Sequence, residues 1–144
     1  MFTNPDDAGI RDLLSSVRRI AVVGASLKEG RPSRGVTRFL IRQGYDIIPV
    51  NPAYAGQEFA PGVPVVDGLD DIDGAIDMVD IFRRSEDAGA VVDDAIRIGA
   101  KAVWMQEGVI DEAAADRALV AGLITVMDRC PAKEIPRLGL KRGE

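Results

Sequence analysis

Short, continuous runs of apolar residues alternate along the chain with segments of helical periodicity. The runs that predict β-strands cover residues 19–24, 46–50, 78–82, 102–105 and 124–127, with a weaker candidate at 63–66. Because these runs lack the apolar–polar alternation of half-exposed strands, they favour strands buried on both faces, as in a parallel sheet. The helical candidates lie near residues 5–17, 34–43, 86–98 and 112–121.

Glycines and capping residues separate these elements. Gly44, Gly99 and Gly122 each follow a helical segment and precede a strand, where a left-handed residue ends a helix. The predicted N-cap residues are Asn4, Ser33, Ser85 and Asp111. The repeated unit of strand, loop, capped helix and glycine predicts an α/β fold, with a doubly wound, mostly parallel sheet of five to six strands and helices on both faces.

Length and composition narrow the possible partners. We expect one domain over residues 1–144, with a core at about 17–131, a short N-terminal helix and a C-terminal tail that packs or frays. The net charge of −5 disfavours nucleic acid and anionic membrane surfaces, and no apolar run is long enough to span a membrane. The single cysteine and the absence of a signal-like start fit a reducing cytoplasm. Histidine is absent, which removes histidine-based catalysis and nearly all zinc sites.

Residues that suit ligand binding collect where the predicted strands end. In an open parallel sheet, ligands bind at the carboxyl ends of the strands. These ends are Gly24-Ala25-Ser26, Asn51-Pro52, Phe82-Arg83, Gln106-Glu107-Gly108 and Asp128-Arg129-Cys130. Strand exits need turn residues in any protein of this class, so no single position decides the matter. The whole set favours a binding edge.

The helix that follows Ser33 is the best candidate to hold a phosphate. A helix N-terminus offers free N–H groups and the positive end of the helix dipole. Two later helices carry carboxylates in their first turns, which would repel an anion. The start after Ser33 carries none, Lys28 and Arg31 precede it, and Arg34 lies in its first turn. We therefore predict a phosphate site within residues 24–35.

The loop after the first strand departs from the usual dinucleotide fingerprint. That fingerprint is Gly-x-Gly-x-x-Gly, followed about 20 residues later by an acid that binds the ribose. Here Ser26 replaces the second glycine, and the second strand ends in Val50-Asn51-Pro52 with no acid at its tip. The spacing disfavours NAD, and the absence of a P-loop motif disfavours ATP or GTP bound in that manner.

Five motifs in order carry a resemblance to a known family. They are Val22-Val23-Gly24-Ala25-Ser26, Gly44-Tyr45-Asp46-Ile47-Ile48-Pro49-Val50-Asn51-Pro52, Val79-Asp80-Ile81-Phe82-Arg83, Gly99-Ala100-Lys101-Ala102-Val103-Trp104-Met105-Gln106-Glu107-Gly108-Val109 and Val126-Met127-Asp128-Arg129-Cys130. Between about residues 19 and 131 the chain resembles the small stand-alone CoA-binding proteins, which are similar to the N-terminal CoA-binding domain of the succinyl-CoA synthetase α subunit. The resemblance implies a Rossmann-like fold that holds coenzyme A (CoA) at the carboxyl edge.

The resemblance also implies roles for individual residues. The phosphates would contact Gly24, Ala25, Ser26, Lys28 and Arg34; Asn51 and Pro52 would line the nucleotide half; Phe82, Arg83, Gln106 and Gly108 would line the pantetheine channel. Arg31, Ser33 and Cys130 complete the predicted cofactor-binding set. Residues 53–71 match the family least, and no metal site is predicted.

No complete catalytic constellation is visible in the sequence. The related synthetase passes a phosphate through a histidine, which this chain lacks. We interpret Cys130 as a buried packing residue, with a reversible mixed disulfide to the CoA thiol as the alternative. The prediction is non-catalytic binding of CoA or an acyl-CoA, as a sensor, carrier or redox-linked module. An NAD(P)-binding redox protein, and an interaction subunit of a CoA-dependent enzyme, remain as alternatives, and a protein partner or homo-oligomer stays open.

Overall fold

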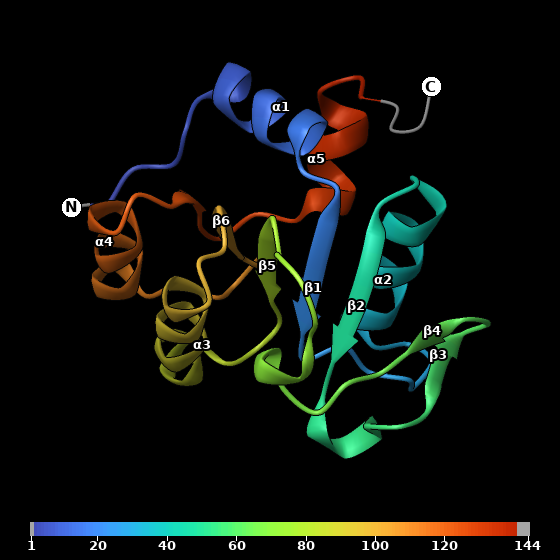
Figure 1. Ribbon diagram of the computed structural model, residues 1–144. Helices are drawn as coiled ribbons and strands as arrows, with labels where there is room; N and C mark the ends of the chain where they lie inside the picture. Colours follow the sequence, from blue (N-terminus) through green and yellow to red (C-terminus); the bar gives the residue numbers. More distant parts are fainter. Residues whose placement is uncertain (1, 141–144) are drawn as a thin grey trace.

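Five of the apolar runs form one parallel sheet. The computed structural model describes residues 2–140. Its main strands are β1 (Arg19–Val23), β2 (Asp46–Val50), β5 (Met78–Ile81), β6 (Ala102–Met105) and β7 (Ile124–Val126). They lie in the order β2-β1-β5-β6-β7, and every neighbouring pair is parallel (Figure 1). The predicted parallel sheet is confirmed, with five strands.

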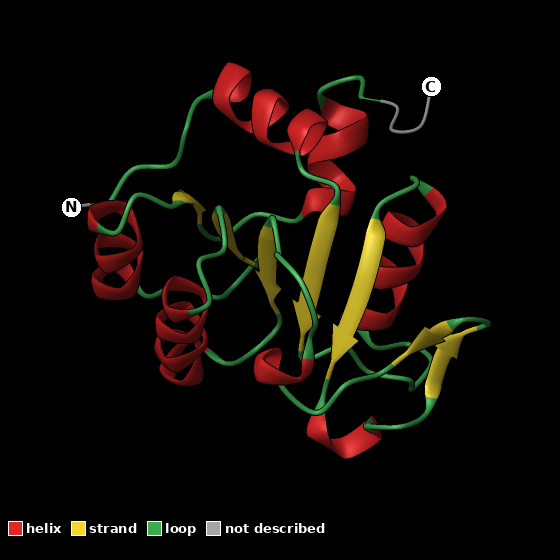
Figure 2. Ribbon diagram, viewed as in Figure 1, coloured by secondary structure: helices red, strands yellow, loops and turns green. Residues whose placement is uncertain are grey.

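Helices cover both faces of this sheet, as predicted (Figure 2). They are α1 (Asp7–Ser16), α2 (Pro32–Arg42), α3 (Ser85–Arg97), α4 (Glu112–Val120) and α5 (Pro131–Arg137). Because side chains alternate along a strand, Ala21 and Val23 pack with α3 and α4, whereas Ile20 and Val22 pack with α1, α2 and α5. Trp104 and Met105 are fully buried on opposite faces of β6.

A small hairpin takes the place of the weakest predicted strand. Only Val63–Pro64 (β4) is a strand, and it pairs antiparallel with β3 (Glu58–Ala60), outside the main sheet. Val66 contacts β2 through one isolated bridge to Val50. Short 3-10 turns, η1 (Pro52–Tyr54) and η2 (Leu69–Asp71), flank this hairpin. The predicted strand at residues 63–66 is therefore wrong as a sixth strand of the sheet.

The predicted C-terminal glycines of the helices are confirmed, whereas three of the four predicted N-cap residues are wrong. Gly44, Gly99 and Gly122 all have positive φ, at 95°, 76° and 90°. Asp111 caps α4 by accepting a hydrogen bond from the Ala114 N–H. The other three predicted N-caps are corrected: Asp6, Arg31 and Arg84 occupy those positions in place of Asn4, Ser33 and Ser85.

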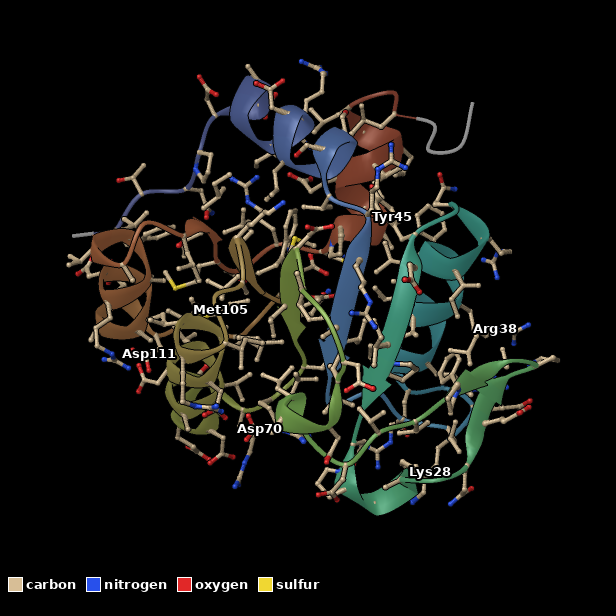
Figure 3. The ribbon with its side chains drawn as sticks, in the orientation of Figure 1. Lys28, Arg38, Tyr45, Asp70, Met105 and Asp111 are labelled. Atoms are coloured by element: carbon tan, nitrogen blue, oxygen red, sulfur yellow. The ribbon has the colours of Figure 1, made fainter. Side chains whose placement is uncertain are left out.

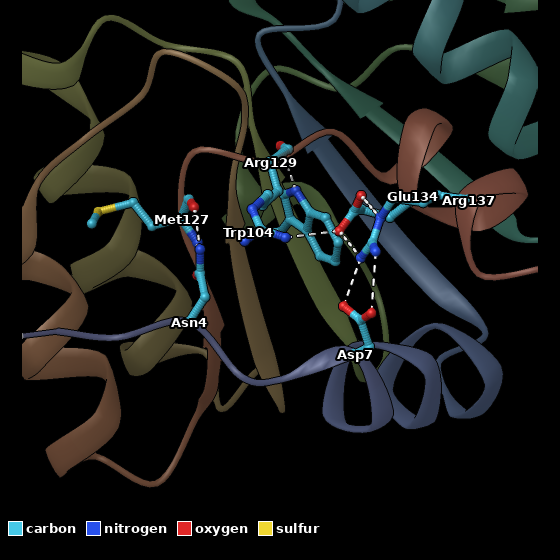
Figure 4. A network of polar contacts seen from close by, with 7 residues as sticks. All are labelled: Asn4, Asp7, Trp104, Met127, Arg129, Glu134 and Arg137. Atoms are coloured by element: carbon cyan, nitrogen blue, oxygen red, sulfur yellow. Dashed lines mark hydrogen bonds and ion pairs between the residues drawn. The ribbon is translucent and has the colours of Figure 1, made fainter.

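Two of these corrections have visible physical causes. Pro32 has a fixed φ and no N–H, which suits the first helical position, so α2 begins there rather than after Ser33. The Asn4 side chain is used elsewhere: its amide donates to the Met127 carbonyl and accepts from the Met127 N–H, both at 2.8 Å (Figure 4). This pair ties the N-terminal segment to the end of β7.

The predicted C-terminal tail contains a helix, α5, which packs on the domain. Pro131 begins it, and the buried side chain of Ile135 joins the core beneath α1 and α2. Arg137 donates to both Glu134 and Asp7, so α5 is bonded to the first turn of α1 (Figure 4). Trp104 Nε1 donates to the Arg129 carbonyl at 2.8 Å just before α5 begins.

Candidate functional site

The strand order reverses between β1 and β5, which opens a crevice at the carboxyl ends of these strands. From β1 the chain passes outward to β2, and it then returns to β5 on the other side of β1. In open α/β sheets, ligands bind at such switch points. A cavity of about 790 Å³ lies there, within the size range of small-molecule sites.

Nine of the fourteen predicted cofactor-binding residues line this cavity. They are Gly24, Ser26, Arg31, Ser33, Asn51, Phe82, Arg83, Gln106 and Gly108. They come from the ends of β1, β2, β5 and β6 and from the start of α2. Segments far apart in the sequence therefore meet at one edge of the sheet.

Gly24 lets two strands approach closely at the floor of the cavity. Its φ is +93°, a conformation that side chains rarely adopt, and a Cβ there would overlap the backbone carbonyl of Phe82. The Gly24 N–H donates to the Val50 carbonyl, and the Phe82 N–H donates to the Val23 carbonyl, both at 2.8 Å. The turn after β1 is thus held from both neighbouring strands and requires glycine.

Side-chain hydrogen bonds fix the rest of the loop against α2. The Ser26 N–H donates to Ser33 Oγ at 3.0 Å, and Asn51 Nδ2 donates to the Ala25 carbonyl at 2.9 Å. In the part of the chain that the structure describes, the backbone N–H groups of Ala25, Leu27 and Ser33 donate to no acceptor. Free N–H groups at the start of a helix form a ready site for an anion.

The charges around the cavity favour an anion once their ion pairs are counted. Arg84 pairs with Asp87 at 3.1 Å, and Glu107 pairs with Lys133 at 2.8 Å, so both carboxylates at the rim are compensated. Among the described ion pairs, none involves Arg31 or Arg83. The Arg83 guanidinium lies over the Gly24 turn, with Nη1 3.1 Å from the position of a Cβ on Gly24.

The loop after β6 is held by neighbours on both sides. Gly108 has a φ of +80°, and its N–H donates to the Asp128 carboxylate at 2.7 Å. Ser85 Oγ donates to the Gly108 carbonyl and accepts from the Ile110 N–H. Ser85, which the sequence predicts as the N-cap of α3, therefore uses its hydroxyl to hold the loop after β6.

The remaining five predicted residues lie outside the cavity lining. Ala25 and Cys130 are buried, Cys130 at the N-cap of α5, and this burial fits the packing interpretation of the cysteine. Arg34 Nη1 lies 3.8 Å from Glu29 Oε1. Lys28 and Pro52 are exposed, and Figure 3 shows Lys28 beyond the carboxyl end of β2.

The sequence interpretation missed part of the cavity. The additional lining residues are Pro32, Ala53, Tyr54, Arg84, Asp87, Glu107 and Val109. Tyr54 belongs to η1, in the stretch with the least family resemblance, so the five motifs gave no signal for it. Arg84 could have been found, because it directly follows the predicted strand end Phe82-Arg83.

No cluster of three or more metal-ligating side chains occurs within residues 2–140. None of the described helices is long and apolar enough to cross a membrane.

Comparison with known proteins gives matches over most of the chain. The sequence profile of a family described as "CoA binding domain" matches residues 18–136. The Bacillus subtilis protein YneT is 39% identical over 127 residues, which cover 88% of this chain and 92% of YneT. A hypothetical protein from Pyrococcus horikoshii OT3 has a similar structure, with a TM-score of 0.86 and 37% identity, over 96% of this chain and 98% of that one.

The fold also occurs within a larger enzyme. An acetyl-coenzyme A synthetase of Ca. Korarchaeum cryptofilum aligns with a TM-score of 0.68 and 22% identity. The alignment covers 83% of this chain and 28% of the synthetase. At this identity the match establishes a shared fold, in line with the synthetase resemblance read from the motifs.

Proposed function

Since this chain belongs to the CoA-binding domain family, we propose that it binds coenzyme A or an acyl-CoA in the cavity at the carboxyl edge of the sheet. The ligand's diphosphate lies at the turn after β1 and the start of α2, and its pantetheine arm runs past Phe82 toward Gln106 and Gly108. The family supports CoA as the ligand, and the geometry of the cavity supports this placement.

One observation carries the proposal: two arginines that form no ion pair within residues 2–140 flank an anion site free of acids. Arg31 stands at the N-cap of α2, whose first turn holds no acid, and Arg83 lies over Gly24. At the neighbouring start of α3, Arg84 is already bonded to Glu86 and Asp87. Charge-assisted hydrogen bonds from arginine to phosphate contribute roughly 1.5–3 kcal/mol each when partly desolvated.

Calorimetric titration with CoA, acetyl-CoA, NAD and NADP tests the proposal. We expect binding of the CoA compounds and none of the dinucleotides. Ser26 replaces the second glycine of the dinucleotide fingerprint, and the tip of β2 carries Asn51, whose Oδ1 accepts from the Ala53 N–H and offers no acid to the ribose of NAD. A preference for NAD would overturn the proposal and restore the dinucleotide alternative.

A matched pair of arginine variants tests the placement of the phosphates. Arg83→Ala removes the guanidinium over the Gly24 turn and should weaken CoA binding roughly 10- to 100-fold. Arg38→Ala is the control, because Arg38 is exposed on α2 away from the cavity (Figure 3). It should change the affinity by less than about twofold. Equal losses in both variants would show that the phosphates lie elsewhere.

The proposed role is binding without chemistry, as a sensor or carrier of the cofactor. The cavity lining holds neither histidine nor cysteine, and its carboxylates, Asp87 and Glu107, are engaged in ion pairs. Incubation with acetyl-CoA should therefore leave the thioester intact. A stable protein partner that co-purifies and restores turnover would favour the interaction-subunit alternative.

A further inference from the structure

Asp80 is a buried acid in the middle of the sheet. It lies in β5 between Val22 of β1 and Trp104 of β6, and its side chain is fully buried. Neither carboxyl oxygen has a hydrogen-bond partner within residues 2–140. A buried carboxyl without a donor is costly, so its presence calls for a physical explanation.

Gln106 presents a second unpaired acceptor on the same face of the sheet. Gln106 follows Trp104 by two residues and lies just past the end of β6, and the register sets Trp104 beside Asp80. Because the Gln106 N–H still donates to the Ile81 carbonyl, the alternation of β6 carries over to Gln106 and places it diagonal to Asp80. Gln106 is 5% exposed and lines the cavity, yet its Oε1 is buried without a donor. Both side chains therefore present an oxygen without a donor, and of the two only the Asp80 carboxyl can take up a proton and donate it.

We propose that Asp80, in its protonated form, is a positioning residue for Gln106: its O–H donates to Gln106 Oε1 and thereby turns the Nε2 hydrogens toward the ligand. This inference rests on the proposed function, because the ligand that Gln106 contacts is the CoA compound bound in the cavity. Gln106 then selects an acceptor at this point of the cavity, which in the proposed placement is an amide carbonyl of the pantetheine arm. One proton thus joins one carboxyl oxygen of Asp80 to Gln106 Oε1, and the second carboxyl oxygen keeps no donor within residues 2–140.

The surroundings of Asp80 favour the neutral acid. Burial raises the pKa of Asp80 to about 8, and the nearby backbone N–H of Ile81, which does not reach hydrogen-bond geometry, opposes this rise only in part. The adjoining strand neighbours, Val22 and Trp104, carry no charge. The titratable side chains of the described elements packed on this face are Asp7, Arg11 and Asp12 of α1, Arg34, Arg38 and Arg42 of α2, Tyr45 before β2, and Arg129, Cys130, Lys133, Glu134 and Arg137 in and before α5.

Of those groups, only Tyr45, Cys130 and Glu134 are buried. The Tyr45 hydroxyl donates to the Leu14 carbonyl, and Glu134 is held by two arginines. No described side chain makes an ion pair with Asp80.

The test is the pH dependence of acetyl-CoA affinity, because this ligand has no free thiol to titrate. Titrations run from pH 7 to about pH 10 on the wild type and on Asp80→Asn, whose amide can donate to Oε1 at every pH. The wild type should lose affinity above about pH 8, approaching tenfold per pH unit. Asp80→Asn should bind within about threefold of the wild type at pH 7 and keep that affinity at higher pH.

A purely structural Asp80 would give a different pattern. The free energy of unfolding would fall as the pH rises toward about 8, because only the native state keeps the Asp80 proton in that range. The affinity for acetyl-CoA would stay constant above pH 8. Identical affinity profiles for wild type and Asp80→Asn would overturn the proposal. So would a wild-type affinity that rises above pH 8, which would indicate a reversed Gln106 amide donating to an ionised Asp80.

Infrared spectroscopy of the ligand-free protein separates this inference from the proposed function. A protonated-carboxyl C=O band should persist to about pH 8, be absent in Asp80→Asn, and shift in Gln106→Leu, which removes the acceptor. If acetyl-CoA does not bind at any pH while this band behaves as expected, the proposed function fails and the pairing stands. If acetyl-CoA binds and Gln106→Leu leaves the band unchanged, the pairing fails alone.

Discussion

At the scale of single residues, the backbone conformation of Gly24 shapes the turn that forms the floor of the cavity. Two neighbouring strands bond to this turn, and the Phe82 carbonyl occupies the space that a Cβ would need. The loop motif was identified from the sequence because glycine followed an apolar strand. No local pattern in the sequence indicates that the close approach is to Phe82, because that contact joins residues 58 positions apart across the sheet.

Gly24→Ala should therefore destabilise the protein more than an ordinary glycine substitution. The positive φ alone costs about 1–3 kcal/mol, and the overlap with Phe82 forces the turn to move in addition. Gly30→Ala is the matched control, because its φ of +83° is similar but its Cβ would meet nothing within 4 Å. Urea unfolding of both variants gives the comparison. Equal losses of stability would show that the contact with Phe82 carries no weight.

At the scale of secondary-structure elements, the contrast between two helix starts is what predicts the phosphate site. The sequence alone shows this contrast, because acids appear at the start of α3 and not at that of α2. The helix begins two residues earlier than the Ser33 cap predicts, because Pro32 fits the first helical turn. That shift matters, because it places Arg31 at the N-cap and frees Ser33 to hold Ser26.

The helix α5 shows what local patterns could not predict. Its seven residues include Pro136, which argues against a helix from sequence alone. It is fastened through long-range contacts: the buried Ile135, and an ion-pair network that joins Glu134, Arg137 and Asp7 (Figure 4). Hydrogen bonds from Arg137 and Arg129 outweigh burial and hold the pKa of Glu134 below its usual range.

Glu134→Gln should consequently loosen α5 in a pH-dependent way. At neutral pH the loss should be about 1–3 kcal/mol, because the buried carboxylate bonds to two arginines. A lowered pKa means that this stabilisation is present above the pKa of the unfolded chain and is lost as the pH falls through the native pKa, so the difference from wild type should shrink in acid. The control Glu86→Gln removes an exposed partner of Arg84 and should cost under about 0.5 kcal/mol. Denaturant titrations at neutral and acidic pH would contradict this account if the two variants behaved alike.

At the scale of the whole molecule, two cavities compete for an anionic ligand. The larger, of about 790 Å³, lies at the carboxyl ends of four strands; the smaller, of about 380 Å³, lies where β1 and β2 begin. The lining of the smaller cavity includes Asp46, Asp71 and Asp73 against the single cation Arg19. The net charge of −5 repels CoA from the surface in general, so local charge decides where it binds.

Hydrogen–deuterium exchange with and without saturating CoA should reveal that choice. We expect slower exchange at residues 24–35, 51–54, 82–87 and 106–109, which surround the larger cavity from separate parts of the chain. The hairpin β3–β4 borders the smaller cavity, and α4 lines neither cavity, so both should exchange as before. In Arg83→Ala the protection should weaken at all four segments together, because one ligand joins them. Protection that instead centres on residues 62–73 would place the ligand in the acidic cavity and contradict the argument from local charge.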